Sequence, residues 1–429
     1  MLAVTSPTFV VPSQPLSSRA ARALRSDALA ALVLGVASAV LYALVGGGQQ
    51  NTSSFPRLAD AFLHGRAWIP DPQPWLELAI RPEGGFWVPF PPFPALVLIP
   101  VVAIVGPGFD IALAAAVAGG VCVALAFGLA RAAGATKRNA MWLAVALAVG
   151  SELLWGAGEG SHHLFAQVVA MALVFGAVRL GMHGRAPILA GLLLGAAVAS
   201  RLPAAFAIPA VAALYAGPVR GWREQWRPIV ARLAALAVPI ALVGIALMVY
   251  NAARFGSPFD FGYGLIVSGQ NQQTGCMPAT CTYPTSEPWF THGIESITYI
   301  PRSLGHALFD FFRVRPSAPF LVPTASGLSI VLTMPVLGLV VRAPWRRLPV
   351  AAAGLGIAGG LLLDLGHGTW GFTQVGWRFI LDVMPLAWLL LSVVAADRGL
   401  GRIAKGLIIW GIAINVYACS VVWLVGLSW

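Results

Sequence analysis

The chain has 429 residues, of which 58% are hydrophobic and 10% are charged, and its mean hydropathy is +0.79. A soluble core of this length would need more charged residues on its surface, so the composition indicates a polytopic membrane protein built from apolar helices. The formal net charge is +11 at pH 7. We expect no nucleic-acid partner, because most of this charge lies in short loops that set topology and no basic, aromatic groove is visible.

Apolar runs alternate with short basic stretches along the whole chain. The basic stretches, at 19–25, 131–138, 220–232, 342–347 and 398–405, are typical of cytoplasmic loops. The pattern predicts an all-α protein with about eleven transmembrane helices, a cytoplasmic N-terminus and an extracytoplasmic C-terminus. The expected spans are 28–46, 110–130, 140–156, 163–181, 187–200, 203–217, 229–250, 318–341, 348–365, 379–395 and 405–427.

The predicted organisation is a disordered cytoplasmic tail over 1–26 followed by a transmembrane domain over 27–429. Two outer loops, at about 47–109 and 251–317, are too long to be simple connectors. The first contains a short predicted helix over 55–64, and the stretch 91–105 predicts a re-entrant or juxtamembrane helix that begins at two prolines. The second loop ends in an amphipathic segment over 300–315, which predicts an interfacial helix.

The second outer loop also carries a pair of cysteines. Cys276 and Cys281 are predicted to form a disulfide if this loop faces an oxidising compartment, whereas Cys122 and Cys419 lie inside apolar runs. Two cysteines without histidines at ligand spacing do not make a metal site. The sequence therefore predicts no metal site here.

Four arginines lie at the outer ends of apolar runs instead of in the basic loops: Arg201, Arg254, Arg302 and Arg378. A guanidinium keeps its charge and offers phosphate oxygens a planar pair of donors. Other polar residues collect at the same ends, namely Glu159, His162, His163, Asp364, His367, Gln374 and Asp382. Ionisable groups at membrane depth usually line a cavity or a substrate path, which predicts a functional cavity at this face. Alternatively, Arg378 and Asp382 could form a structural i,i+4 ion pair, and the histidines could be interfacial residues.

Several motifs together resemble the GT-C membrane glycosyltransferases. They are Val88-Pro-Phe-Pro-Pro-Phe-Pro-Ala-Leu-Val-Leu98, Arg201-Leu-Pro203, Gly376-Trp-Arg-Phe-Ile-Leu-Asp-Val-Met-Pro385, and a longer one that runs Tyr250-Asn-Ala-Ala-Arg-Phe-Gly-Ser-Pro-Phe-Asp-Phe-Gly-Tyr263. The resemblance covers most of the chain and is nearest to bacterial branches similar to protein O-mannosyltransferases and lipid A aminoarabinose transferases. It therefore also implies a bacterial plasma membrane.

The resemblance implies that a sugar is transferred from a polyprenyl-phosphate donor to an acceptor at the outer face, with an acidic residue just after the first span as general base. In this chain Asn51-Thr52 stands where such an acidic pair would fall, and a neutral side chain cannot accept the proton. Asp60 is then the preferred base and Glu77 the second choice, with Glu83, His163 or no base as further alternatives.

The sequence hypothesis is thus a GT-C-like glycosyltransferase in which Arg201, Arg254 and Arg378 bind the donor phosphate. His162, His163, Tyr263, Gln374 and Asp382 are expected to line the same cavity. Expected partners are the lipid-linked sugar, membrane lipids and an acceptor that is a lipid, glycan or protein. We expect no cofactor, although scattered acidic residues leave a divalent metal open. Two alternatives stand beside this: a non-catalytic protein that binds lipid-linked sugar, and a lipid or solute transporter.

Overall fold

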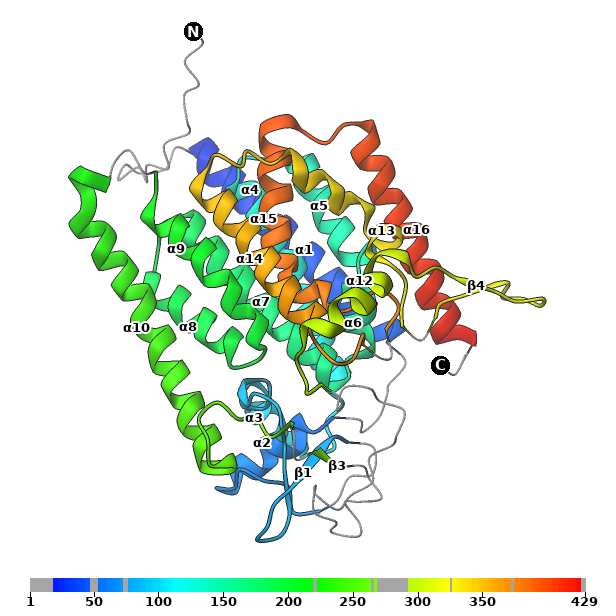
Figure 1. Cartoon of the computed structure of the whole chain (residues 1–429). Helices are drawn as coiled ribbons and strands as arrows, with labels where there is room; N and C mark the ends of the chain where they lie inside the picture. Colours follow the sequence, from blue (N-terminus) through cyan, green and yellow to red (C-terminus); the bar gives the residue numbers. More distant parts are fainter. Residues whose placement is uncertain are drawn as a thin grey trace.

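The computed structural model describes residues 18–46, 53–71, 76–218, 222–263, 266–267, 292–324, 326–371 and 374–425. Long helices stand roughly side by side in one body, and α2, α3, β1 and β3 gather below it in Figure 1. Cys276, Cys281 and Asn51-Thr52 lie outside the described residues. The same holds for residues 1–17 of the predicted tail, but α1 begins at Ser18, so residues 18–26 of that tail are helical.

Seven described helices are long and apolar enough to cross a membrane, and a bent pair would make eight. The seven are α1 (Ser18–Val45), α4 (Ile111–Ala132), α7 (His162–Met182), α10 (Trp222–Phe255), α14 (Leu348–Leu365), α15 (Ile380–Arg398) and α16 (Arg402–Val425). The pair is α5 (Lys137–Val149) and α6 (Leu153–Glu159), which meet at a bend of 51°. The helical, multi-pass membrane class is therefore confirmed, whereas the number eleven is not.

Three shorter apolar stretches account for part of that difference. They are α3 (Phe93–Val105), α8 (Pro187–Val198), and η1 (Leu202–Ala207) continued by α9 (Ile208–Ala216). Residues 318–341, which we expected as one span, instead contain β5 (Leu321–Val322), α13 (Ile330–Thr333) and η6 (Pro335–Arg342). Pro335 ends α13 because it has no backbone N–H to donate and its ring clashes with the preceding turn.

Burial separates central from peripheral helices. In the most apolar window of each helix, 78% of α15 and 72% of α7 is buried, against 17% in both α1 and α10. Helices α7 and α15 therefore form the centre, and the exposed side chains of the others, such as Leu44 and Val249, form an apolar surface suited to lipid. Close helix contact needs small residues: a Cβ atom on Gly35 of α1 would lie 2.9 Å from the carbonyl oxygen of Gly120 in α4.

The basic loops meet at one end of the body. Arg131 at the end of α4 donates to Asp27 of α1 over 2.8 Å, and Lys137 at the start of α5 donates to the Ser26 hydroxyl over 2.8 Å. Contacts of this kind also join the start of α14 to the end of α15. Side chains in or beside the basic stretches thus join α1 to α4 and α5, and α14 to α15.

The two long loops that the sequence predicts to be extracytoplasmic, and that keep the name outer loops below, meet at the other end in a small sheet. β1 (Leu78–Ile80) pairs antiparallel with β2 (Phe86–Trp87) and with β3 (Ile266–Val267), in the order β2-β1-β3. The first loop also holds α2 (Phe55–Leu63), and the second holds η5 (Ile297–Tyr299), α12 (Ile300–Phe309) and β4 (Arg313–Val314), which pairs with β5. The helix predicted over 55–64 is thus present, whereas the segment 300–315 is helical only as far as Phe309 and then forms β4.

Candidate active site

A bidentate ion pair lies where three helices approach each other near the outer loops. Arg201 has an extended backbone and lies between α8 and η1. It donates from Nη2 to Asp382 Oδ2 at 2.7 Å and from Nε to Asp382 Oδ1 at 3.2 Å. Gln167 of α7 donates to the same carboxylate at 2.9 Å, and Asp364 of α14 lies 4.0 Å from the Arg201 guanidinium. Asp382 therefore pairs with Arg201 and not, as one alternative had it, with Arg378.

The second arginine of this region is buried in the segment before α15. The Arg378 amide donates to Gln374 Oε1 at 3.2 Å, its carbonyl accepts from Gln167 at 3.3 Å, and its guanidinium lies 5.1 Å from the centre of the Phe379 ring. Burial, and then the positive charge of Arg201, lower its pKa to about 10. Two guanidinium groups that repel one another at a partly dry site form an attractive place for an anion.

The two arginines also act on the residues around them. The pKa of His367, just after α14, is lowered to about 4 by burial and then by Arg201 and Arg378. His367 is therefore neutral at pH 7. Burial raises the pKa of Tyr263 to about 12, with Arg201 opposing that rise. Tyr263 keeps its proton at pH 7 and can donate a hydrogen bond.

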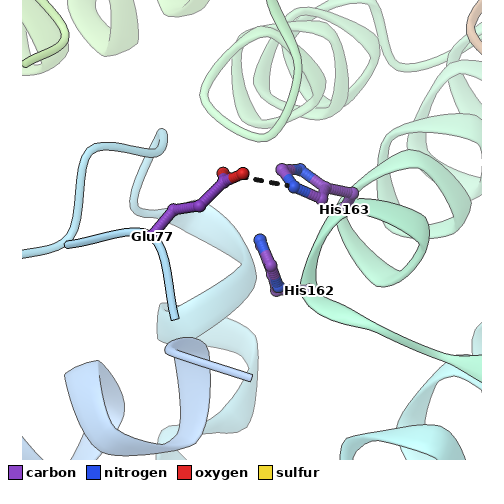
Figure 2. Close-up of side chains that lie close together, drawn as sticks. All are labelled: Glu77, His162 and His163. Atoms are coloured by element: carbon purple, nitrogen blue, oxygen red, sulfur yellow. Dashed lines mark ion pairs between the residues drawn. The ribbon is translucent and has the colours of Figure 1, made fainter. Parts of the chain in front are cut away.

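Glu77, His162 and His163 form a second group, which we call the Glu77 cluster. Figure 2 shows Glu77 on the segment that leads into β1, facing both histidines at the start of α7. His163 Nε2 lies 3.4 Å from Glu77 Oε2, and the two imidazole rings are 3.8 Å apart at their centres. Phe90 of the first outer loop packs against both rings, at 5.0 and 5.2 Å. The sequence placed these residues at one face, but it did not show that Glu77 meets them.

The Glu77 cluster has the donor set of a metal site. One ligand atom from each residue lies within 4.8 Å of the other two. Two imidazole nitrogens and a carboxylate suit zinc or a similar divalent ion, and bonds of about 2.1 Å set tetrahedral ligands roughly 3.4 Å apart. The separation of 3.4 Å between His163 and Glu77 fits that geometry. These residues could hold a divalent ion after a small movement of His162.

Arg254 is engaged elsewhere. It donates to the Val88 carbonyl at 2.7 Å and to Asn251 Oδ1 at 3.1 Å, and its guanidinium lies 3.8 Å from the centre of the Tyr250 ring. These contacts tie the end of α10 to the first outer loop. The Tyr-Asn-x-x-Arg-Phe motif therefore has a structural task that sequence reasoning did not foresee.

Three other residues named from the sequence have local tasks. Asp60 of α2 lies 3.7 Å from His64, the residue that follows this helix, and their side chains are 29% and 62% exposed. Arg302 on α12 donates to the Gly368 carbonyl and lies 5.1 Å from the Tyr299 ring. Gln374 donates to the carbonyls of Ser326 and Trp370, the latter at 3.1 Å, and so holds the segment that carries Arg378. Gln167 was missed, although it follows His163 by four positions in α7 and so shares its face.

Comparison with solved structures decides the fold. The chain matches ArnT from Cupriavidus metallidurans bound to undecaprenyl phosphate with a TM-score of 0.50 and 18% identity, over 91% of this chain and 64% of that chain. The apo state of the same protein gives a TM-score of 0.50 and 17% identity, over 92% and 65%. The chain has the GT-C fold. This confirms the fold that the motifs implied.

A third match is the archaeal oligosaccharyltransferase AglB from Archaeoglobus fulgidus, in complex with an inhibitory peptide and a dolichol-phosphate. Its TM-score is 0.45 and its identity 13%, over 93% of this chain and 55% of that chain. This chain spans slightly less than two thirds of the length of ArnT, namely 64% of the undecaprenyl phosphate complex and 65% of the apo state. No family model and no curated protein sequence matches it.

Proposed function

We propose that this GT-C chain is a membrane glycosyltransferase that uses a polyprenyl-phosphate-linked sugar at the extracytoplasmic face. The observation that carries the proposal is the nearness of two arginines, Arg201 and the buried Arg378, because the positive charge of Arg201 lowers the pKa of Arg378. A GT-C neighbour has been solved with undecaprenyl phosphate, a ligand whose charge such a pair suits. The proposal requires the end of the helix bundle that carries Arg201 and Arg378 to face the extracytoplasmic side of the membrane.

The proposed reaction is a displacement at the anomeric carbon of the sugar. The acceptor hydroxyl oxygen forms the new bond to that carbon, while the bond from carbon to the phosphate oxygen breaks and polyprenyl phosphate leaves. Arg201 and Arg378 stabilise the negative charge that develops on the leaving phosphate. The hydroxyl proton passes to a carboxylate. Asp382 does not serve, because it is already occupied by Arg201 and Gln167.

We assign the base role to Glu77 ahead of Asp60. Glu77 is partly exposed, with 38% of its side chain accessible, and its carboxylate lies 3.4 Å from His163 Nε2. It also shares the electrostatic field of Arg378. Asp60 instead contacts His64 on its own helix. If the Glu77 cluster instead holds a divalent ion, Glu77 is one of its ligands and not the base, and that ion would supply Lewis-acid stabilisation of the phosphate.

A transfer assay in proteoliposomes tests the proposal. A panel of polyprenyl-phosphate-linked sugars is supplied together with lipid, glycan and peptide acceptors that carry hydroxyl groups, and release of polyprenyl phosphate is measured by mass spectrometry. We expect release by the wild type and a loss of about 10²- to 10⁴-fold in Glu77→Gln, with Asp60→Asn near normal. Arg378→Lys should also lose activity, because an ammonium lacks the planar pair of donors. Arg342→Lys is the matched control, because Arg342 belongs to the basic stretch 342–347, which is predicted to lie on the opposite, cytoplasmic side.

The same assay separates the alternatives. Tight binding of the lipid-linked sugar without turnover in any variant would identify a non-catalytic binding protein. Movement of the lipid across the bilayer without bond cleavage would identify a transporter. Normal turnover in Arg378→Ala and Glu77→Gln, with the fold intact, would overturn the assignment of the site.

A further inference from the structure

A carboxyl group with no part in the proposed chemistry is buried deep in the protein. Glu152 lies at the bend between α5 and α6 and has 0% of its surface exposed. An acidic side chain is rarely buried so completely unless it is paired or hydrogen-bonded, because removing it from water is costly. The question is therefore what this side chain contacts.

Glu152 binds the backbone of the segment that carries Arg378. Its Oε2 accepts a hydrogen bond from the Gly376 amide at 2.6 Å, and the Val375 amide also interacts with the carboxyl group. The approach requires glycine, because a Cβ atom at position 376 would lie 2.7 Å from Glu152 Oε2. The Gly376-Trp-Arg stretch is thus shaped on one side by Glu152.

The opposite side of the same segment is paired with another strand-like stretch. The Leu328 amide donates to the Val375 carbonyl at 2.8 Å, and the Trp377 amide donates to the Leu328 carbonyl at 3.1 Å. The Gly376 amide points the other way and would be left without a partner in the interior if Glu152 were removed. Leu328 and Glu152 therefore hold the segment from two sides.

We propose that Glu152 is a positioning residue for Arg378: it sets the backbone two residues before this arginine and so places the guanidinium for the donor phosphate. The inference rests on the proposed function of Arg378. Glu152 and Arg378 also attract each other electrostatically, so the carboxyl group balances part of the buried positive charge. A base or a direct ligand would need contact with the substrate, and Glu152 has no solvent-exposed surface for it.

Two measurements on the full-length protein in detergent test the inference. The first is affinity for undecaprenyl phosphate, measured by native mass spectrometry, in Glu152→Ala, Glu152→Gln, Arg378→Ala and the double variant. We expect Glu152→Ala to weaken binding by at least about tenfold. Glu152→Gln, which keeps an oxygen for the Gly376 amide, should lose less. The double variant should bind no worse than Arg378→Ala, because both changes remove the same contact.

The second measurement is hydrogen exchange at the peptide that contains Gly376, which needs no ligand. Faster exchange is expected in Glu152→Ala and not in Ser151→Ala. Ser151 is the matched control, since it lies at the same bend, is equally buried and donates to the Leu147 carbonyl at 2.6 Å. A merely structural role would lower stability in both variants but would not give the non-additive binding effect.

The outcomes distinguish this inference from the proposed function. Weaker binding in Arg378→Ala with wild-type binding and wild-type exchange in both Glu152 variants would overturn the positioning role alone. Additive losses in the double variant would overturn it as well. If the wild type and Arg378→Ala bind the lipid phosphate equally, the proposed function of Arg378 fails, and the role of Glu152 in placing it fails too.

Discussion

Removal of the Asp382 carboxylate should destabilise the protein far more than removal of a surface carboxylate from the same helix. The Asp382 side chain is 1% exposed and the Arg201 side chain 19% exposed, and they share two hydrogen bonds at 2.7 and 3.2 Å. In Asp382→Ala a buried guanidinium loses its main partner and Gln167 loses an acceptor. Asp364, at 4.0 Å, compensates only in part.

The expected cost follows from the burial of the pair. Loss of one partner from a buried ion pair costs about 3–5 kcal/mol. Because the temperature shift per kcal/mol falls with chain length, that cost corresponds to a fall in Tm of roughly 3–10 °C for a chain of this size. Asp382→Asn, which keeps one acceptor oxygen, should fall less. The double change Arg201→Leu with Asp382→Leu should cost less than either single change, because no unpaired charge remains.

The assay is thermal unfolding in detergent, followed by intrinsic tryptophan fluorescence. Asp397→Ala is the matched control. Asp397 is also on α15 and pairs with Arg347 at 3.0 Å, but these side chains are 34% and 46% exposed, and such pairs contribute about 0–1 kcal/mol. Equal Tm changes in Asp382→Ala and Asp397→Ala would refute the view that the Arg201–Asp382 pair is buried and structurally central.

Three further predictions concern metal, pH and topology. If the Glu77 cluster is a metal site and Glu77 is not the base, purified protein should contain about one equivalent of zinc or a similar ion by elemental analysis, and His163→Ala should lose it; equal metal in both would exclude the Glu77 cluster as its site. His367 has a pKa lowered to about 4 by burial and by Arg201 and Arg378, so its contribution to stability is complete above about pH 6.5 and is lost as pH falls through 4. His367→Gln should therefore reduce the fall in Tm over that window, and an unchanged fall would contradict the assignment. Finally, in a cysteine-free background, an impermeant thiol reagent added outside should label Glu83→Cys and not Lys137→Cys; the reverse would invert the orientation.

Much of the fold could be predicted because membrane helices leave strong signals in sequence. Apolar runs and basic loops located the long helices, and the two prolines before α3 marked its start correctly. The stretch 318–341 has the same composition as a span, yet it is broken, because composition does not show where Pro335 interrupts the hydrogen-bond ladder. Segments shorter than a bilayer crossing, such as α8, have no such clear signal.

The residues of the site could be predicted more easily than their partners. Helix ends with polar residues pointed to Arg201, His163, Arg378 and Asp382. Sequence spacing left open a pair between Arg378 and Asp382, whereas the structure joins Asp382 to Arg201, 181 positions away. Contacts between remote segments depend on how helices pack, and a single sequence does not record this. The same reason hid the approach of Glu77 to His163, which requires the segment before β1 to lie beside the start of α7.

The three-stranded sheet has a consequence for how a large lipid-linked molecule could enter. Ala79 pairs with Trp87 on one side and with Ile266 on the other, so one short strand is shared by both outer loops. Neither loop can swing away while these backbone hydrogen bonds remain. If the site opens at this end to admit a lipid-linked molecule, there are two ways. Either the paired parts of both loops move together, or β2 or β3 first breaks its hydrogen bonds to β1.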